Sequence, residues 1–161
     1  MSAAEARCKM LMMSDSHDKW PVSPAGQAAE AGLSQTDQPG SDQRRFVVLR
    51  HEQDGHHHFD LMIDTGAALA TWKMSEPPET IRVSPLDCVR LPDHRRRYLD
   101  YEGPLTENRG AVTRHDEGYC IVHACSAARW EVTFCGGEFR GRVLLERTAQ
   151  SDNWSLRVAS A

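Results

Sequence analysis

The segment Phe46–Asp64, FVVLRHEQDGHHHFDLMID, restricts the fold of this chain more than any other stretch of the sequence. Its first part, Phe46–Leu49, is a run of residues that favour β-structure, and Glu52–Gly55 has the polar composition of a turn with a glycine able to take positive φ. From His56 to Asp64 the residues alternate as in a half-buried strand. The segment therefore predicts two strands joined by a tight turn.

Alternation places the residues of the second strand on two faces of the hairpin. The face turned towards the core holds His57, Phe59, Leu61 and Ile63, and the opposite face holds His56, His58, Asp60, Met62 and Asp64. His58 and Asp60 are therefore neighbours on one face, and closing the hairpin brings His51 beside them. Strand parity favours His58 as the histidine of this group, and His57 is the least suited because it shares the core face.

Two imidazoles and a carboxylate on rigid strands form a cradle for a divalent metal ion or a phosphate group. Three protein ligands leave coordination positions open for water and substrate, as a catalytic metal requires. The carboxylate and the absence of thiolate ligands favour Mn2+, with Zn2+ or Co2+ as alternatives. The competing interpretation is that His51, His58 and Asp60 are ordinary surface or hydrogen-bonded side chains.

The overall composition is that of a soluble, single-domain chain of 161 residues. The net charge of −4 disfavours polyanion binding through overall charge but is compatible with a local basic groove. The five cysteines are odd in number and contain no C-x-x-C pair, which predicts reduced thiols in a cytoplasmic protein and disfavours a zinc–cysteine site. The apolar patch Met10–Met13 is too short to span a membrane, so we expect no membrane partner.

Residues 1–43 differ in composition from the rest of the chain. They are rich in Ala, Ser, Gln, Gly, Asp and Pro, show no sustained period of 2 or 3.6, and carry three basic and six acidic residues. We interpret 1–43 as a mostly disordered leader, with room for a short helix at Ala3–Met13. The folded domain is then 44–161, which is close to neutral with 16 basic and 17 acidic residues.

Short strand patterns separated by turn residues fill the folded domain after the first hairpin. We expect strands at Leu69–Met74, Asp87–Leu91, Ala111–His115, Tyr119–His123, Arg129–Cys135, Phe139–Arg147 and Trp154–Val158, with a turn at Asp116–Gly118. Trp72, Trp130 and Trp154 are expected in the core. No long helical pattern occurs, so the fold class is mainly β, a small antiparallel β-barrel or sandwich with few short helical turns.

The most charged stretch, DHRRRYLDYE at 93–102, holds a second group of candidate residues. A helical turn there would place His94 and Tyr98 four residues apart on one face, although a plain loop fits the sequence equally well. A histidine can protonate a leaving oxygen and a tyrosine hydroxyl can orient a phosphate, whereas the alternative is a solvated His94 and a half-buried Tyr98. Arg95–Arg97 form either a solvated face or contacts to a nucleic-acid backbone, and the loop residue Arg109 has a guanidinium suited to phosphate.

These residues, in this order, resemble the 3′-phosphoesterase domain found at the N-terminus of bacterial DNA ligase D and its free-standing relatives. The resemblance rests on FVVLRH (46–51), HFDLMID (58–64), ATWKM (70–74), DHRRRYLDYEG (93–103) and GEFRGRVLLER (137–147). It covers nearly all of 44–158 and none of the leader.

The resemblance implies a compact β-barrel with a manganese-dependent site that trims 3′ ends, removing a terminal ribonucleoside and then a 3′-phosphate. The family's metal ligands correspond to His51, His58 and Asp60, and its phosphate-contacting pair to His94 and Tyr98. The implied partners are nucleic-acid 3′ ends, with DNA ligase and polymerase repair proteins as further candidates, and we expect a monomer.

The sequence departs from the family pattern at two positions. The interval between His51 and His58 is one residue longer than usual, so the hairpin turn must absorb an insertion. The arginine that grips the phosphate two residues after the metal aspartate is replaced by Met62, which carries no charge. Arg109 or one of Arg95–Arg97 is then needed to compensate, or the protein is a non-catalytic module that binds nucleic-acid ends or phosphate.

Overall fold

The computed structural model of this protein describes residues 43–148 and 151–160, and the leader predicted at 1–43 lies outside these residues except for Gln43. The strands are β1 (Gln43–Gln53), β2 (His56–Asp64), β3 (Leu69–Met74), β4 (Leu86–His94), β5 (Gly103–Pro104), β6 (Ala111–Cys125), β7 (Arg129–Gly136), β8 (Arg140–Arg147) and β9 (Asn153–Val158). Two short 3-10 helices, η1 (Pro78–Arg82) and η2 (Arg96–Leu99), complete the described elements. The predicted mainly β fold class is confirmed.

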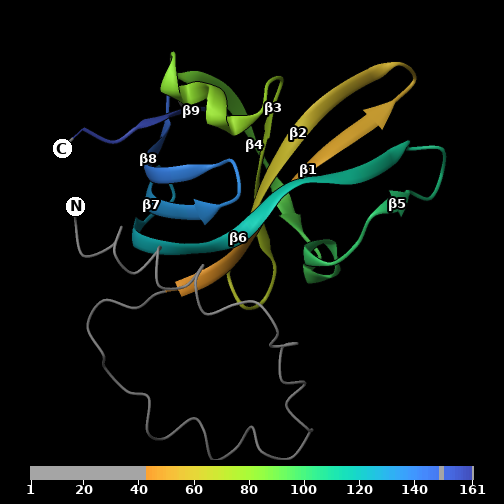
Figure 1. Cartoon of the computed structure of the whole chain (residues 1–161), viewed down its shortest axis with the longest axis horizontal. Coiled ribbons are helices and arrows are strands. Elements are labelled where there is room, and N and C mark those ends of the chain that lie inside the picture. The colour runs from red at the N-terminus through yellow and green to blue at the C-terminus, as the bar shows by residue number, and fades with distance from the viewer. Residues whose placement is uncertain (1–42, 149–150, 161) are drawn as a thin grey trace, which may run out of the picture.

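The strands form a closed antiparallel barrel of eight strands, with β5 attached outside the ring. Neighbouring strands follow the order β1-β2-β3-β4-β9-β8-β7-β6, and pairing of β1 with β6 closes the ring. Figure 1 shows the β1–β2 hairpin and the β5 end of β6 extending away from the side formed by β7, β8 and β9. The fold is therefore a barrel and not an open sandwich. No helix among the described residues is long and apolar enough to cross a membrane.

The first hairpin forms where the alternating pattern predicted it, with a turn narrower than expected. Gln53 pairs with His56, so Asp54 and Gly55 alone make the turn. Both have positive φ, 52° and 77°, which is the requirement of a two-residue type I′ turn and explains the Asp-Gly sequence. This turn sets the register of β1 against β2 and places His51 directly opposite His58.

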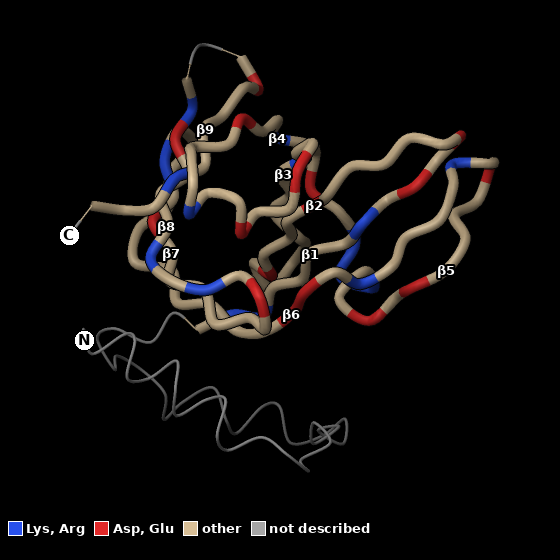
Figure 2. Tube along the Cα trace, turned by 45° about the horizontal axis from the view of Figure 1, so that its top comes forward, with Lys and Arg blue, Asp and Glu red and all other residues tan. Residues whose placement is uncertain are grey.

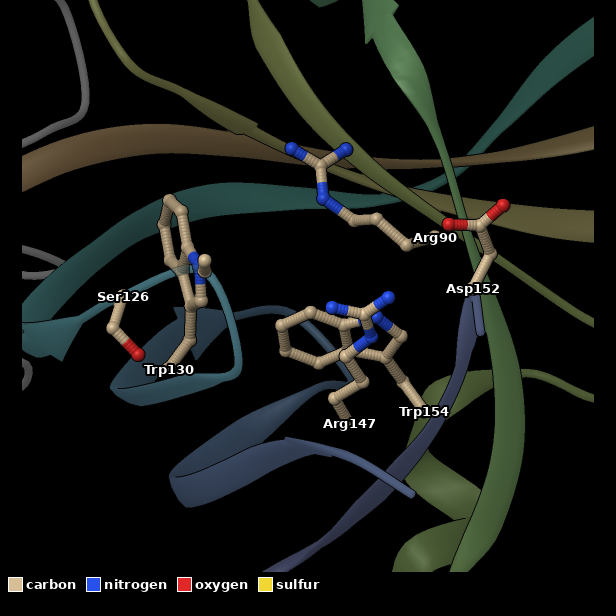
Figure 3. Close-up of a pocket in the computed structure, with 7 residues that line it drawn as sticks. Arg90, Ser126, Trp130, Arg147, Asp152 and Trp154 are labelled. Atoms are coloured by element: carbon tan, nitrogen blue, oxygen red, sulfur yellow. The ribbon is translucent and has the colours of Figure 1, made fainter. Parts of the chain in front are cut away.

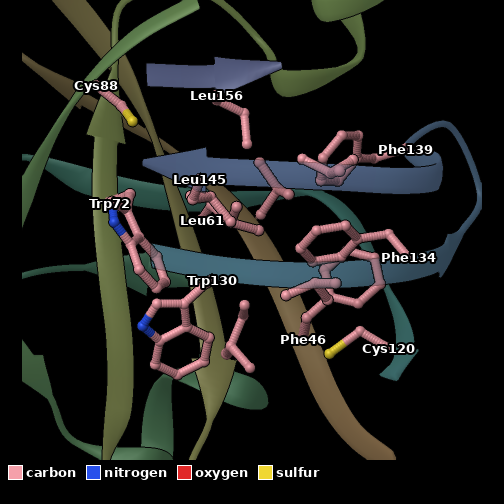
Figure 4. Close-up of a cluster of buried hydrophobic side chains, with 14 of the residues drawn as sticks. Phe46, Leu61, Trp72, Cys88, Cys120, Trp130, Phe134, Phe139, Leu145 and Leu156 are labelled. Atoms are coloured by element: carbon pink, nitrogen blue, oxygen red, sulfur yellow. The ribbon is translucent and has the colours of Figure 1, made fainter. Parts of the chain in front are cut away.

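The interior of the barrel is filled by aromatic and aliphatic side chains from every strand of the ring (Figure 4). Trp72 is fully buried, and its ring centroid lies 5.2 Å from that of Trp130 and 5.7 Å from that of Trp154, both in edge-to-face geometry. Phe46 packs edge-to-face on Phe134 at 4.9 Å. Edge-to-face pairs stabilise a core beyond the area that they bury. The prediction that the three tryptophans lie in the core is confirmed.

A second apolar cluster lies on the outer face of the barrel wall, beneath η2. Its buried members are Val47, Leu49, Met62, Leu69, Leu99 and Val112, with Tyr98, Tyr101 and Leu105 packed against them. Because side chains of a strand alternate between faces, Val47 and Leu49 of β1 enter this cluster while Phe46 and Val48 enter the core. The wall made by β1 and β2 is thus covered on both sides.

The turn predicted at Asp116–Gly118 is wrong, because β6 runs unbroken through these residues. The register against β1 shifts there, with Val48 opposite Asp116 and Leu49 opposite Arg114, so an extra residue forms a β-bulge. The Asp116 carboxylate serves a different turn, accepting backbone N–H groups of Gly137, Glu138 and Phe139 at 2.7 to 3.1 Å. A residue typical of turns therefore sits in a strand because it caps the turn between β7 and β8.

The cysteines follow the expectation of reduced thiols in part. Cys88 and Cys125 are free thiols, and burial, helped by the Asp87 charge, raises the pKa of the Cys88 thiol to about 12. Cys88 is therefore not a nucleophile at neutral pH. Cys125 is exposed. Cys135 is buried but disulfide-bonded, so the prediction of a reduced thiol is wrong for that residue.

The cap formed by Asp116 generates a test of fold stability. We expect Asp116→Ala to lower the free energy of unfolding by about 3 kcal/mol, because three N–H groups lose a charged acceptor in a site that is 7% exposed. Asp116→Asn, which keeps one acceptor oxygen, should cost about half as much. The exposed neighbour Glu117 is the matched control, and Glu117→Ala should cost less than about 1 kcal/mol. Urea denaturation measures all three, and equal costs for Asp116→Ala and Glu117→Ala would contradict the assignment.

Candidate metal centre

His51, His58 and Asp60 come together on the outer face of the β1–β2 hairpin. His51 Nδ1 lies 3.2 Å from His58 Nε2, and His58 Nε2 lies 3.4 Å from Asp60 Oδ2. One potential ligand atom from each residue lies within 4.8 Å of the others, and no second group of three or more such residues occurs in the described part of the chain. The register supplies this geometry, since His51 is opposite His58 and Asp60 follows two residues later on the same face.

The side chains present fit a divalent cation. Asp60 is 4% exposed, and its Oδ1 atom is buried without a hydrogen-bond partner. A buried carboxylate oxygen left in this state is costly unless a cation or a proton neutralises it. Two nitrogens that bind one ion at about 2.1 Å each lie roughly 3.0–3.4 Å apart, and the separation of the two imidazole nitrogens, 3.2 Å, falls in this range.

The other nitrogen of His51 is held by the backbone. His51 Nε2 donates to the carbonyl oxygen of Arg109 at 2.5 Å, from the loop between β5 and β6. A carbonyl only accepts, so Nε2 carries the hydrogen and Nδ1 presents its lone pair towards His58. Histidines that bind metals usually have their second nitrogen fixed in this way. This carbonyl is a functional group that sequence reasoning missed, because no side-chain pattern identifies it.

The predicted phosphate-contacting pair lies together at the junction of β4 and η2. His94 is the last residue of β4, its Nδ1 lies 2.9 Å from the carbonyl oxygen of Pro92, and its ring centroid is 6.0 Å from that of Tyr98. A helical turn does form, but η2 begins at Arg96, so it contains Tyr98 and not His94. Tyr98 rests on the outer apolar cluster that also contains Met62. Among the described residues, no hydrogen bond, ion pair or ring contact joins His94 or Tyr98 to His51, His58 and Asp60.

An ion pair anchors η2 to the end of β2. Arg96 Nε and Nη2 donate to the two carboxylate oxygens of Asp64 at 2.9 and 2.8 Å. Burial alone would raise the pKa of Asp64, but the hydrogen bonds from Arg96 and from the N–H of Gly66 outweigh it and hold the pKa below its ordinary value. The stabilisation is therefore present above pH ~4 and is lost as the pH falls through the lowered pKa. At neutral pH the pair keeps Tyr98 in place.

The other candidate arginines differ in how they are engaged. The guanidinium of Arg97 lies 5.3 Å from the ring centroid of Tyr98 and 5.0 Å from that of Tyr101, and no described carboxylate pairs with Arg97 or with the exposed Arg95. The guanidinium of Arg109 donates to the backbone and hydroxyl oxygens of Thr106. Figure 2 shows basic and acidic positions interleaved along the described chain. A local set of cations near η2 is thus present without a large basic face.

Met62 leaves the position of the expected phosphate-binding arginine without a charge. It is 2% exposed and lies in the outer apolar cluster beside Leu49 and Val112. It shares a face with His58 and Asp60, as strand parity predicted. The outer apolar cluster therefore provides an uncharged surface, here called the apolar floor, beside His51, His58 and Asp60.

A pocket of about 270 Å³ opens elsewhere on the barrel, lined by Arg90, Ser126, Ala127, Trp130, Arg147, Asp152 and Trp154 (Figure 3). Sequence reasoning did not find it. Arg90 is already engaged, since it donates to the carbonyl oxygens of Thr71 and Leu91 and to the Asp93 carboxylate. The pocket contains none of the predicted site residues.

Comparison with known proteins assigns no family to this chain. No protein-family model matches its sequence, and no curated protein matches it with significant similarity. The fold and the site geometry define a structural class. The protein is an eight-stranded antiparallel β-barrel with two histidines and an aspartate grouped on the outside of its first hairpin.

Because Asp60 Oδ1 has no hydrogen-bond partner, we expect a substitution of this ligand candidate to increase the stability of the metal-free protein. Asp60→Asn should raise the stability of the metal-free protein by about 1 kcal/mol, because it removes a buried carboxylate charge whose Oδ1 atom has no hydrogen-bond partner. It should also abolish the stabilisation that we expect Mn2+ to give the wild type, which would be about 2.7 kcal/mol at one hundred times the dissociation constant. Thermal unfolding in EDTA and in MnCl2 measures both effects.

Asp64→Asn is the matched control for this test, on the same strand and face. It breaks the pair with Arg96, so it should destabilise the protein slightly and leave the response to Mn2+ intact. A metal-free Asp60→Asn protein that is less stable than the wild type, or one that keeps the full Mn2+ response, would contradict the assignment of Asp60 as a ligand.

Proposed function

We propose that this protein is a metal-dependent phosphoesterase that processes 3′-phosphate or 3′-ribonucleotide ends of nucleic acid in DNA repair. The observation that carries the proposal is the grouping of His51, His58 and Asp60 with their potential ligand atoms within 4.8 Å of one another. The barrel fold and the order of the sequence motifs support it, because both agree with what the resemblance to the ligase D 3′-phosphoesterase domain implies.

Each site residue has a role in this proposal. His51, His58 and Asp60 hold the ion, for which we propose Mn2+. A divalent cation in such a site supplies charge stabilisation at the phosphoryl group and lowers the pKa of water for attack. His94 is kept in orientation by the carbonyl oxygen of Pro92, which accepts from its Nδ1–H, so in the imidazolium form its Nε2–H is the group that stabilises or protonates the leaving oxygen.

Tyr98 and the nearby cations orient the substrate in the same proposal. The Tyr98 hydroxyl contacts a non-bridging oxygen, while Arg95 and Arg97 of the η2 region neutralise the neighbouring phosphates of the strand. Arg109 contributes its backbone carbonyl to His51, and its guanidinium reaches a phosphate only after releasing Thr106.

A trimming assay on defined 3′ ends tests this function. A labelled DNA primer ending in a 3′-phosphate or in one ribonucleotide should be processed with Mn2+ and not with EDTA. We expect His58→Ala to lose more than about 100-fold in rate, because even a change in the residues that support a metal ligand costs about 10–100-fold. His56→Ala is the matched control, since His56 is exposed on the same strand and lies outside the group, and it should retain activity. Absence of metal-dependent trimming, or full activity of His58→Ala, would sink the proposal.

The burial of Met62 favours one alternative, a non-catalytic module that binds nucleic-acid ends. An apolar floor beside the metal-site residues provides no charge for a phosphate at that position. Removing one charge-stabilising donor from an active site typically costs about 10²–10³ in rate. Under this alternative the protein binds ends with a salt-dependent affinity but does not turn them over.

Met62→Arg separates the two functions. If the missing cation alone limits turnover, the substitution should raise the trimming rate by about 10²-fold or more. If the protein is already an efficient enzyme, the same change should have little benefit and should disturb the apolar cluster. Rates and end binding are measured together on the 3′-phosphate primer, at two salt concentrations. A variant that folds, binds ends and still shows no turnover would remove the charge-loss explanation.

A further inference from the structure

We propose that the loop 105–110 between β5 and β6 is a positioning element of the metal centre, in which Gly110 allows the Arg109 carbonyl to hold the His51 ring. The metal-binding part of this inference rests on the proposed function, but the hold on the ring is a property of the metal-free protein. In this inference, Arg109 has a different role. Its backbone oxygen orients the metal ligand His51, whereas the sequence suggested that its guanidinium binds phosphate.

The loop is closed by its own hydrogen bonds. Leu105 N–H donates to the carbonyl oxygen of Gly110 at 2.7 Å, and Arg109 N–H donates to that of Thr106 at 3.4 Å. The Arg109 side chain adds two more contacts to Thr106, at 3.0 and 2.9 Å. The Arg109 side chain is thus folded back onto the loop, while the Arg109 carbonyl oxygen accepts from His51.

The backbone of the loop takes a conformation that few residues tolerate. Glu107, Asn108 and Gly110 have positive φ angles of 62°, 54° and 83°. Such angles are strained for residues other than glycine and persist only where the surroundings enforce them. Gln53 of β1 supplies one enforcing contact, because its Nε2 donates to the carbonyl oxygen of Asn108 at 3.1 Å.

Gly110 lies directly against the backbone of β1. A Cβ atom built on it would lie 1.8 Å from the backbone oxygen of Glu52 and 2.9 Å from Cβ of Gln53. The obstructing atom at Glu52 belongs to the strand itself and cannot rotate away. The loop therefore docks on the two residues that follow His51 only if position 110 has no side chain.

Docking at this point fixes both the protonation and the direction of the His51 ring. Nε2 donates its hydrogen to the Arg109 carbonyl, and Nδ1 is left to face His58. If the loop moved away, the ring would rotate and Nδ1 would sample other directions. Loss of such a supporting contact typically lowers metal affinity by about 10–100-fold.

Gly110→Ala tests the inference against Gly66→Ala. Gly66 also has positive φ, 93°, but a Cβ atom there meets nothing within 4 Å, so its substitution imposes backbone strain without a clash. We expect Gly110→Ala to bind Mn2+ about 10–100-fold more weakly than the wild type by calorimetry, and Gly66→Ala to bind within about threefold of it.

The metal-free protein provides a second readout that does not depend on the ion or on activity. In the wild type the His51 Nε2–H proton should give a hydrogen-bonded NMR signal, shifted downfield and correlated with its nitrogen. Gly66→Ala should keep this signal and Gly110→Ala should lose it. Circular dichroism establishes that each variant is folded.

Gln53→Ala keeps the test decisive if Gly110→Ala does not fold. It removes the exposed hydrogen bond to Asn108 and leaves the buried core of the barrel unchanged, so we expect a loss of Mn2+ affinity of about 2–10-fold and a weaker His51 signal. Equal Mn2+ affinities in the two glycine variants, an unchanged His51 signal, or a wild type that binds no Mn2+ would overturn the inference. A wild type that shows the signal and binds Mn2+ but trims no 3′ ends would uphold it while removing the proposed enzymatic function.

Discussion

The pairing of β1 with two partners, β2 on one edge and β6 on the other, is the constraint on which the rest of this structure depends. Pairing with β6 closes the barrel, and pairing with β2 puts His51 opposite His58. A slip of one residue would turn every side chain of β2 to the other face and would separate the histidines. The two-residue turn at Asp54–Gly55 prevents that slip, so fold and site share one determinant.

On the outer face of the β1–β2 wall, a buried charged group lies next to an apolar cluster, an arrangement that is unusual in proteins. Asp60 is a buried carboxylate with an unpaired oxygen, and it lies between His58 and an apolar cluster that includes Leu49 and Met62. Buried charge of this kind lowers stability unless a cation compensates it, which is typical of residues kept for binding and not for folding. The apolar floor also lowers the local dielectric and so strengthens any charge interaction formed above it.

Local patterns predicted the elements well wherever the alternation was regular. The strand at Leu69–Met74 has the predicted bounds, and the tryptophans lie in the core. The errors fall where a long-range contact overrides local preference. Asp116 and Gly118 are typical of a turn, but Asp116 caps the distant turn after β7, and Gly118 has its Cβ position 2.2 Å from the Cys135 backbone oxygen. Such residues are selected by partners that are remote in the sequence.

Short-range order along the chain was enough to specify the mainly β class, the first hairpin and which residues share its outer face, because strand alternation has a period of two residues. Three features could be seen only in the folded molecule. They are the closure of the barrel by β1 and β6, the bulge opposite Val48, and the hydrogen bond from His51 to the Arg109 carbonyl. Each of these brings together backbone groups far apart in the chain, and a backbone carbonyl has no identity in an amino-acid sequence. The local sequence therefore determines which side chains could bind a metal, whereas tertiary packing determines how those side chains are oriented.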